Sequence, residues 1–298
     1  MREKTLKWVM IAPAIVILLA LVIYPLMWSL GLSFFDYSIM LKRAPIFIGV
    51  ENYIGIVNDP TVWDNFKVTA YFLAVALPIE FLLGFGIALL LYEEFKGRRV
   101  VLTLLLIPMM LAPIAVGVFY RFILDSTFGI FTYLLSLIGI DGFRWYTPQW
   151  VIPCVALVDI WMWTPFMVLI LLAGLTAVPR YLYEAANIDR AGWIMKFRYI
   201  TLPIMKPLIG VAVLFRTMDI MKVFDMIFIL TDGGPGNASE LISFRVYREA
   251  FQYFHTGRAT ALSYIFLVMI IVLTNIYLRF LTRRPAQARI ARELEVTI

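Results

Sequence analysis

Long apolar segments separated by short polar ones set the pattern of this chain. Three runs, residues 8–35, 100–120 and 259–278, contain no charged side chain. A helix needs about twenty apolar residues to cross the hydrocarbon core of a bilayer, and each run reaches that length. The pattern therefore predicts a helical integral membrane protein that crosses the bilayer several times.

The apolar runs, with the polar clusters between them, predict six membrane-spanning helices in a single transmembrane domain, residues 1–298. The expected spans are residues 8–32, 67–92, 100–124, 149–178, 204–230 and 259–280. An even number of spans places both termini on one side. The positive start resembles a signal peptide, but its apolar run is about twice the usual length, so we expect a retained first helix.

Lysine and arginine are unevenly divided between the two sides that this topology defines. Sixteen lie near the termini and in the loops 93–99 and 179–206, whereas eight lie in the opposite loops. Cytoplasmic loops of membrane proteins carry an excess of these residues. The bias predicts that both termini and the 179–207 loop face the cytoplasm.

The 179–207 loop is the most polar segment between two long apolar runs. Pro179 suits the first turn of a helix, and residues 181–191 predict a short helix with a surface of small alanines. Gly192 can end it, because glycine tolerates the left-handed conformation found at helix C-termini. A second helical piece then runs to about residue 200. This helix–turn–helix is either a docking element for a partner or an ordinary solvated loop.

A cluster of turn-forming residues opens the loop after the fifth span. It contains Gly233, Gly234 and Pro235. Because glycine permits backbone angles that other residues avoid, we expect a tight, irregular turn in this external loop. In the loop before the fourth span, the apolar residues 130–140 predict a segment that lies along the membrane interface.

Composition agrees with the membrane class and narrows the functions. Of 298 residues, 62% are apolar and 15% charged, whereas a soluble domain has about half and about a quarter. The net charge is +6. The basic residues flank the predicted spans and form no separate basic face, so we expect membrane lipid and no nucleic acid as a partner.

Catalytic and metal-binding chemistry is sparse in this sequence. Cys154 is the only cysteine and His255 the only histidine, so neither a disulfide nor a zinc site can form within the chain. No P-loop motif is present to hold ATP, and neither H-E-x-x-H nor G-x-S-x-G occurs. We expect no enzyme activity, cofactor or metal in this chain.

Ionisable residues inside predicted spans are costly and usually face a partner or a cavity. Glu80 lies in the second span and Asp159 in the fourth, and the fifth span carries Arg216, Asp219, Lys222 and Asp225 at every third position. In one interpretation the four charges of the fifth span line a translocation path, with Arg216 and Asp219 deepest and nearby aromatic rings stacking on a sugar. In the other they form a ladder of ion pairs that orients the fifth helix against another subunit.

Residues 184–203 resemble the EAA loop of bacterial ABC importer permeases. The family pattern is Glu-Ala-Ala, then an acidic residue and a glycine, then Ile-x-Leu-Pro. The sequence departs from it at Arg190, where the family usually has glycine, and we expect Gly192 to provide the turn instead. The pattern is matched at Glu184, Ala185, Ala186, Asp189, Ala191, Phe197, Ile200, Leu202 and Pro203.

A second group of residues narrows the resemblance to carbohydrate-uptake permeases of the maltose and glycerol-phosphate type. The resemblance covers nearly the whole chain. It implies an all-α integral membrane protein with six transmembrane helices, in the type I ABC importer permease fold, with a cytoplasmic EAA coupling helix. The matching positions are Phe224, Asp225, residues 230–235, Tyr247, Ala250 and Phe251, with Ala12, Pro13, Tyr24, Pro25, Ser33, Phe34 and residues 49–53 near the N-terminus.

The resemblance also implies a division of labour in the bacterial inner membrane. A periplasmic or lipid-anchored solute-binding protein would deliver the solute, and a second homologous permease subunit would share the path. Two ATP-binding subunits would hold ATP and Mg²⁺. They would receive Glu184, Ala185, Ala186, Asp189, Arg190, Ala191, Gly192 and Pro203. The path would be lined by Asp159, Met162, Trp163 and Phe166, and by Arg216, Asp219, Ile220 and Val223.

Two other functions stay open at this point. A proton-coupled secondary transporter could use the intramembrane charges as a relay, although such folds usually show two related halves and none is evident here. A scaffold or receptor could dock a partner other than an ATPase on the 179–207 loop. The sequence favours a permease subunit of a binding-protein-dependent importer for a sugar, polyol or sugar derivative.

Overall fold

The structure, a computed structural model, describes residues 3–40 and 44–282. The basic residues Arg2, Lys42 and Arg43 and the four arginines after residue 282 lie outside the described residues. The chain divides into two compact units, one comprising Met1–Phe66 with Ile242–Met269 and the other Lys67–Leu241 with Ile270–Ile298. The expectation of a single domain therefore stays a prediction.

Five helices of the described chain are long and apolar enough to cross a membrane. These candidate spans are Lys7–Leu32, Pro60–Tyr92, Val151–Thr176, Trp193–Met221 and Thr256–Arg279. A bent pair, Arg98–Met110 and Pro113–Ile123, brings the number to six if it counts as one span. The all-α membrane fold is thus confirmed, and the first, fourth and sixth spans lie close to their predicted bounds.

The first unit begins with a long apolar helix and contains a small hairpin. Its elements are α1 (Glu3–Leu18), the π-helical turn η1 (Leu19–Ile23), α2 (Tyr24–Leu32), β1 (Phe35–Asp36), β2 (Ile46–Phe47), α3 (Glu51–Val57), α13 (Ile242–Tyr247), the π-helical turn η4 (Arg248–Gln252) and the start of α14 (Thr256–Thr282). The two strands pair antiparallel. A Cβ atom on Gly257 would lie 2.0 Å from the carbonyl oxygen of Phe35, so only glycine permits this close approach.

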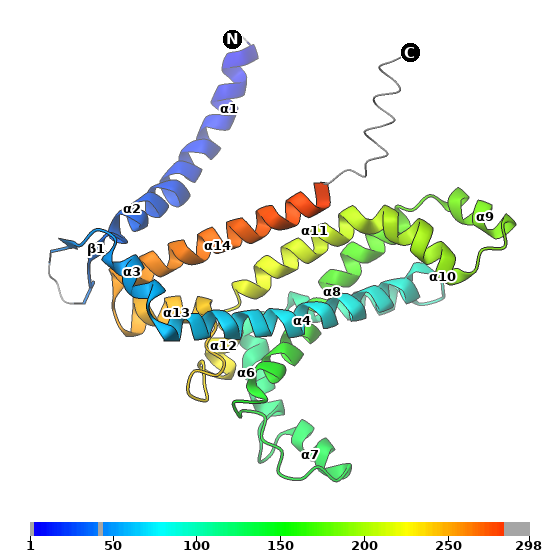
Figure 1. The fold of residues 1–298 in the computed structure, drawn as a ribbon. Helices are drawn as coiled ribbons and strands as arrows, with labels where there is room; N and C mark the ends of the chain where they lie inside the picture. Colours follow the sequence, from blue (N-terminus) through cyan, green and yellow to red (C-terminus); the bar gives the residue numbers. More distant parts are fainter. Residues whose placement is uncertain (1–2, 41–43, 283–298) are drawn as a thin grey trace. The chain divides into compact units, whose positions relative to one another are not determined.

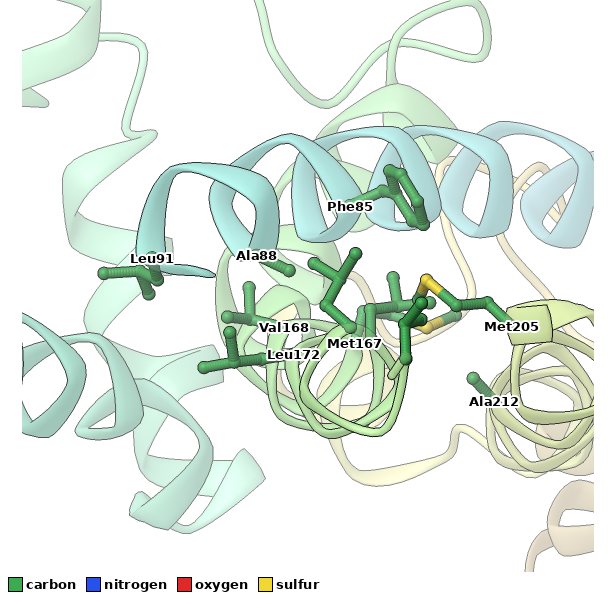
Figure 2. Packing of buried hydrophobic residues seen from close by; sticks show 11 residues of the cluster. Phe85, Ala88, Leu91, Met167, Val168, Leu172, Met205 and Ala212 are labelled. Carbon is green, nitrogen blue, oxygen red and sulfur yellow. The ribbon is translucent and has the colours of Figure 1, made fainter. Parts of the chain in front are cut away.

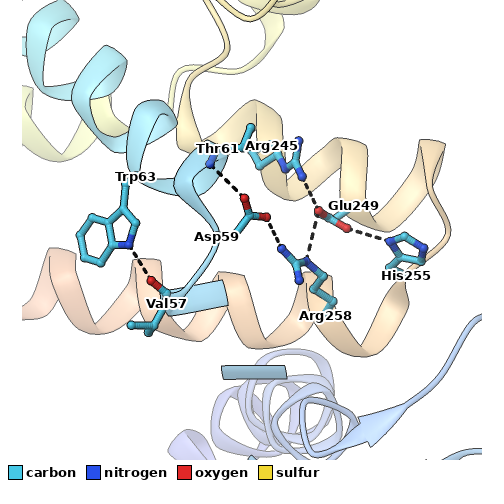
Figure 3. Close-up of polar contacts among 8 residues, drawn as sticks. All are labelled: Val57, Asp59, Thr61, Trp63, Arg245, Glu249, His255 and Arg258. Atoms are coloured by element: carbon cyan, nitrogen blue, oxygen red, sulfur yellow. Dashed lines mark hydrogen bonds and ion pairs between the residues drawn. The ribbon is translucent and has the colours of Figure 1, made fainter. Parts of the chain in front are cut away.

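Charged side chains hold the first unit together (Figure 3). Glu249 is buried and accepts hydrogen bonds from Arg245 at 2.8 Å, and its carboxylate also lies 3.0 Å from His255 Nδ1. Arg258 pairs with Asp59 at 2.5 Å and with Glu249 at 3.4 Å. Asp59 also accepts the backbone N–H of Thr61 at 2.9 Å, and therefore caps the next helix.

This cap explains why the second span starts earlier than predicted. The helix α4 runs from Pro60 to Tyr92, whereas the predicted span begins at residue 67. Pro60 can occupy the first helical position because its missing N–H would have no partner there. Asp59 and Pro60 therefore mark the start of this helix.

The second unit holds the rest of α4 and the remaining helices (Figure 1). In chain order they are α5 (Arg98–Leu106), the 3-10 turn η2 (Pro108–Met110), α6 (Pro113–Ile123), α7 (Ile130–Leu137), α8 (Val151–Thr176), α9 (Arg180–Ile188), α10 (Trp193–Lys196), the π-helical turn η3 (Phe197–Thr201), α11 (Leu202–Met221) and α12 (Asp225–Leu230). Helix α11 packs on α8, and α12 packs on α6.

Two predicted spans differ from the structure in this unit. The segment 100–124 is not one straight helix, because it bends by 94° between Met110 and Pro113, where two prolines remove backbone donors. The segment 204–230 is also interrupted. Its helix starts upstream at Trp193 and ends at Met221, and α12 is a separate short helix.

The core of the second unit lies between α4, α8 and α11 (Figure 2). Phe85 and Ala88 of α4 meet Met167 and Val168 of α8, while Met205 reaches across from α11. A Cβ on Gly84 would lie 2.5 Å from Met167 Cβ. Membrane helices associate through such close packing of small residues, and it brings the polar residues of the three helices within reach of one another.

Candidate functional site

A buried ion cluster joins these three helices. The guanidinium of Arg216 in α11 donates to both carboxylate oxygens of Glu80 in α4, at 2.6 and 2.8 Å. It also donates to Asp159 in α8, and all three side chains are fully buried. Paired charges of this kind are tolerated in a membrane interior because each satisfies the other.

A pocket of about 290 Å³ opens beside this cluster. Trp163 forms part of its wall, and the Arg216 guanidinium carbon lies 5.2 Å from the centre of the tryptophan ring, within range of a cation–π interaction. The lining residues come from α6, α8, α11, α12 and the short link between the last two. They are Pro113, Asp159, Trp163, Arg216, Asp219, Lys222, Val223, Phe224, Asp225 and Met226.

Five of the eight predicted path residues meet at this pocket. Asp159, Trp163, Arg216, Asp219 and Val223 line it. Met162 and Ile220 are instead buried in the helix core. Phe166 packs against Trp163, with ring centres 6.4 Å apart, and does not line the pocket.

Two buried polar atoms in this cluster lack a protein partner. Asp159 Oδ1 and Arg216 Nη1 form no hydrogen bond with any residue in the described part of the chain. Buried polar atoms are nearly always paired, so these two unpaired atoms distinguish the cluster from an ordinary buried ion pair.

The predicted ladder of ion pairs along the fifth span is wrong except at one step. Lys222 pairs with Asp219 at 3.5 Å, and both side chains are largely exposed. Arg216 turns instead to Glu80 and Asp159. The helix α11 ends at Met221, so Asp225 belongs to α12 and does not continue a series of ion pairs along one helix.

Glu80 belongs to the buried cluster, although the sequence predicts it only as a charge within the second span and not as a path residue. The signal that could have placed it is charge balance, because a buried arginine needs carboxylates. Glu80 and Asp159 are the two acidic residues that the sequence places in the second and fourth spans.

The 179–207 loop contains a short helix, α9, and exposes apolar side chains on the protein surface. In α9, Tyr181 is 66% and Ile188 83% exposed, and Trp193 and Ile194 follow with similar exposure. Glu184, Ala185 and Asp189 are exposed, whereas Ala186 and Ala191 are half-buried. Pro203 lies in the first turn of α11. Apolar side chains exposed in a group indicate an interaction surface.

The end of α9 corrects the prediction for Gly192. The helix stops at Ile188, three residues before the predicted end. The Ala191 N–H bonds to Ala186 at 2.9 Å and the Arg190 N–H to Asn187 at 3.0 Å, which is the Schellman arrangement. Arg190 itself adopts the left-handed conformation, with φ of 56°. Gly192, with φ of −71°, does not provide the turn.

The glycine-rich turn after the fifth predicted span is tight and irregular, as predicted. Gly233 has φ of 78° and Asp232 of 49°. The hydroxyl of Ser239 donates to the carbonyl of Gly234 at 2.7 Å, and the Gly234 N–H donates to Thr231 at 2.9 Å. Pro235 follows in the same turn.

These features define a class of protein: a multi-pass membrane transport subunit with a polar pocket between its helices and a docking helix. Residues 80–287 match the family described as binding-protein-dependent transport system inner membrane component. The chain belongs to this family. It is a permease subunit of a binding-protein-dependent importer, and the membrane location and the resemblance found in the sequence are confirmed.

Individual relatives extend over nearly the whole chain. It is 36% identical to a trehalose/maltose transport system permease protein of Thermococcus litoralis, covering 93% of this chain and 94% of the relative. It is 32% identical to a sulfoquinovosyl glycerol transport system permease protein of Agrobacterium fabrum, covering 94% and 91%. A solved bacterial ABC transporter involved in alginate import has a chain of the same fold, with a TM-score of 0.82, 25% identity and coverage of 95% and 96%.

Proposed function

We propose that this chain is the permease subunit of an ATP-driven importer for a sugar, polyol or sugar derivative. The observation that carries the proposal is the convergence of Asp159, Trp163, Arg216, Asp219 and Val223 on one pocket. The named relatives transport trehalose and maltose or sulfoquinovosyl glycerol, and the solved transporter imports alginate. All of these solutes are carbohydrates or contain a sugar.

The pocket offers the groups that a hydroxyl-rich solute requires. Asp159 Oδ1 can accept a hydroxyl hydrogen and Arg216 Nη1 can donate to a hydroxyl oxygen. The Trp163 ring supplies an apolar face, and binding pockets typically combine such aromatic walls with a few placed polar groups. Asp219, Lys222 and Asp225 add charges of both signs, so the lining carries three acidic and two basic side chains and does not favour an anionic solute.

Movement driven by ATP binding and hydrolysis on the partner subunit would reach this chain through α9. The exposed apolar face of this helix, with Glu184 beside it, would dock on an ATP-binding subunit that holds ATP and Mg²⁺, and this chain would hold neither. A complete transporter would contain a second homologous permease, two ATP-binding subunits and a solute-binding protein that reaches the Gly233–Pro235 turn. Both termini and α9 would lie in the cytoplasm.

ATP binding and the loaded binding protein would both shift one equilibrium, between a state in which the pocket opens outward and a state in which it opens to the cytoplasm. ATP would act at the cytoplasmic end of the chain and the binding protein at the opposite end. A ligand shifts such an equilibrium only through a difference in its affinity for the two states. ATP would favour the state in which the pocket opens outward, and its hydrolysis would return the pocket to the cytoplasmic side. The chain would therefore act without catalytic residues of its own.

The test is made on the co-expressed complex in lipid. ATP hydrolysis is measured with binding protein loaded from a panel of sugars, polyols and anionic sugar derivatives. Stimulation by one class supports the proposal and names the substrate. A purified complex without an ATPase subunit, or one without a response to any loaded binding protein, would favour a scaffold or a proton-driven transporter.

A variant links the pocket to this activity. Asp219→Ala should change the rate or the solute preference of transport with assembly intact, because Asp219 lines the pocket but is not part of the buried cluster. Loss of assembly in this variant would instead assign Asp219 a structural role.

A further inference from the structure

A hydroxyl pair joins α9 directly to the start of α11. The hydroxyl oxygens of Tyr183 and Thr201 lie 2.7 Å apart. Thr201 is buried and Tyr183 half-buried, so water competes little for this bond. Lys196 Nζ also donates to Asn187 Oδ1, but that second bond is exposed.

The position of Thr201 gives this bond its mechanical importance. Thr201 is the last residue of the π-helical turn η3, and α11 starts at the next residue. A π-helical turn replaces the regular ladder of hydrogen bonds with a wider one and often occurs at functional sites. From Leu202 onward α11 runs as one helix to Met221, with Pro207 inside its second turn, and Arg216 lies in it. A displacement at Thr201 is therefore carried along the helix to the pocket.

The remaining connection between α9 and α11 is less direct. The chain passes from Ile188 through a four-residue link to α10, and this link contains Arg190 in the left-handed conformation. Tyr183, in contrast, packs with Phe197 and Ile200 against the buried core between α4, α8 and α11. Phe197 in turn contacts Phe85 of α4, with ring centres 5.5 Å apart.

We propose that Tyr183 is a positioning residue whose hydroxyl bond to Thr201 makes α9, η3 and α11 move as one body. This inference rests on the proposed function, because it concerns how movement of α9 reaches the pocket. Without the bond, α9 still docks on its ATPase partner, but part of its displacement is absorbed in the 189–192 link. Hydrolysis then continues while fewer solute molecules cross per ATP.

The experiment measures the number of solute molecules transported per ATP hydrolysed in proteoliposomes that contain the whole complex. The probe is trehalose, or the member of the panel that stimulates the unmodified complex. Tyr183→Phe and Thr201→Val each remove the bond with little change in volume. We expect the ratio to fall about fivefold in each, the factor that corresponds to one net hydrogen bond, with ATP hydrolysis retained.

Matched variants separate this role from a merely structural one. Tyr133→Phe removes a tyrosine hydroxyl at an exposed site of α7, outside the 179–207 loop, and Thr201→Ser keeps the hydroxyl; both should retain the original ratio. The double variant Tyr183→Phe with Thr201→Val should be no worse than either single variant, because all three lack the same bond.

An unchanged ratio, additive losses in the double variant, or a parallel fall of hydrolysis and transport would each overturn the inference. Failure of the proposed function looks different, because the unmodified complex would then show no ATP-driven uptake of any solute in the panel.

Discussion

At the scale of single residues, Arg190 occupies a position that favours glycine. A side chain in the left-handed conformation costs about 1–2 kcal/mol relative to glycine. Glycine recovers this cost but has a more flexible unfolded chain, so we expect Arg190→Gly to stabilise the end of α9 by about 1 kcal/mol. Hydrogen exchange of the Ala191 amide, which bonds to Ala186, should slow about fivefold.

Gly192→Ala is the control for this prediction. Gly192 has an ordinary φ of −71°, and nothing lies within 4 Å of the place of an added Cβ. Exchange at Ala191 should stay the same in this variant. Exchange in Arg190→Gly that is as fast as in the unmodified protein would show that the left-handed turn carries no strain.

The buried arginine provides the second residue-scale prediction. Arg216→Met leaves Glu80 and Asp159 buried without their cation, and breaking a buried pair in this way costs about 3–5 kcal/mol. The midpoint of thermal unfolding in detergent should fall strongly. The triple variant Glu80→Gln, Asp159→Asn and Arg216→Met removes all three charges, and much of the stability should return.

Equal losses in the single and the triple variant would contradict this account, since they would place the stability in the shape of Arg216 and not in charge pairing. The sequence identified each of these charges but not their pairing. Arg216 and Glu80 lie 136 positions apart, and a periodic pattern along one helix says nothing about contacts at that separation.

At the scale of elements, the close approach of α4 and α8 depends on Gly84. A Cβ there would meet Met167 Cβ at 2.5 Å, whereas nothing lies within 4 Å of a Cβ on Gly86. Gly84→Ala should therefore destabilise the second unit by about 1–3 kcal/mol through overpacking. Gly86→Ala is the matched control on the same helix, and thermal unfolding compares the two. Equal unfolding midpoints for Gly84→Ala and Gly86→Ala would show that α4 and α8 move apart to accommodate the added Cβ without loss of stability.

The elements also show where sequence patterns reach their limit. Apolar length predicts that a segment enters the membrane, but the same length fits a straight helix or two bent pieces. Pro108 and Pro113 favour a break in this segment, but they do not specify the 94° bend or the packing of α6 against α12 that follows it. No glycine or proline follows the end of α11 at Met221. Lys222 and Val223 come next, and neither residue type signals the end of a helix.

At the scale of the whole molecule, membrane class, the number of candidate spans and the family follow from the sequence. The apolar runs determine the first two, and the EAA pattern determines the third. The path prediction depended on position in the chain, because the resemblance implies the location of the path and not the residue types in it. For this reason Met162 and Ile220 turned out to be core residues, since a helix has a buried face and a pocket face that chain position does not distinguish.

We expect assembly with the proposed ATPase partner to depend on the charge at α9. Glu184 lines a surface pocket of about 550 Å³ together with Glu93, Glu94 and Arg180, and the excess of carboxylates favours a basic side chain from the partner. Glu184→Lys should leave the chain inserted and folded but reduce co-purification of the ATPase subunit at least about tenfold, because like charges then meet at the interface. Transport should fall in parallel.

The exposed residue Asp141 supplies the control for this charge reversal. It lies in the loop before α8, which the lysine and arginine bias places on the opposite side of the membrane from α9. Asp141→Lys changes the net charge of the chain by the same amount and should leave ATPase co-purification unchanged. If both variants lost the ATPase equally, overall charge would control assembly. If Glu184→Lys retained both the ATPase and transport, α9 would not be the docking helix.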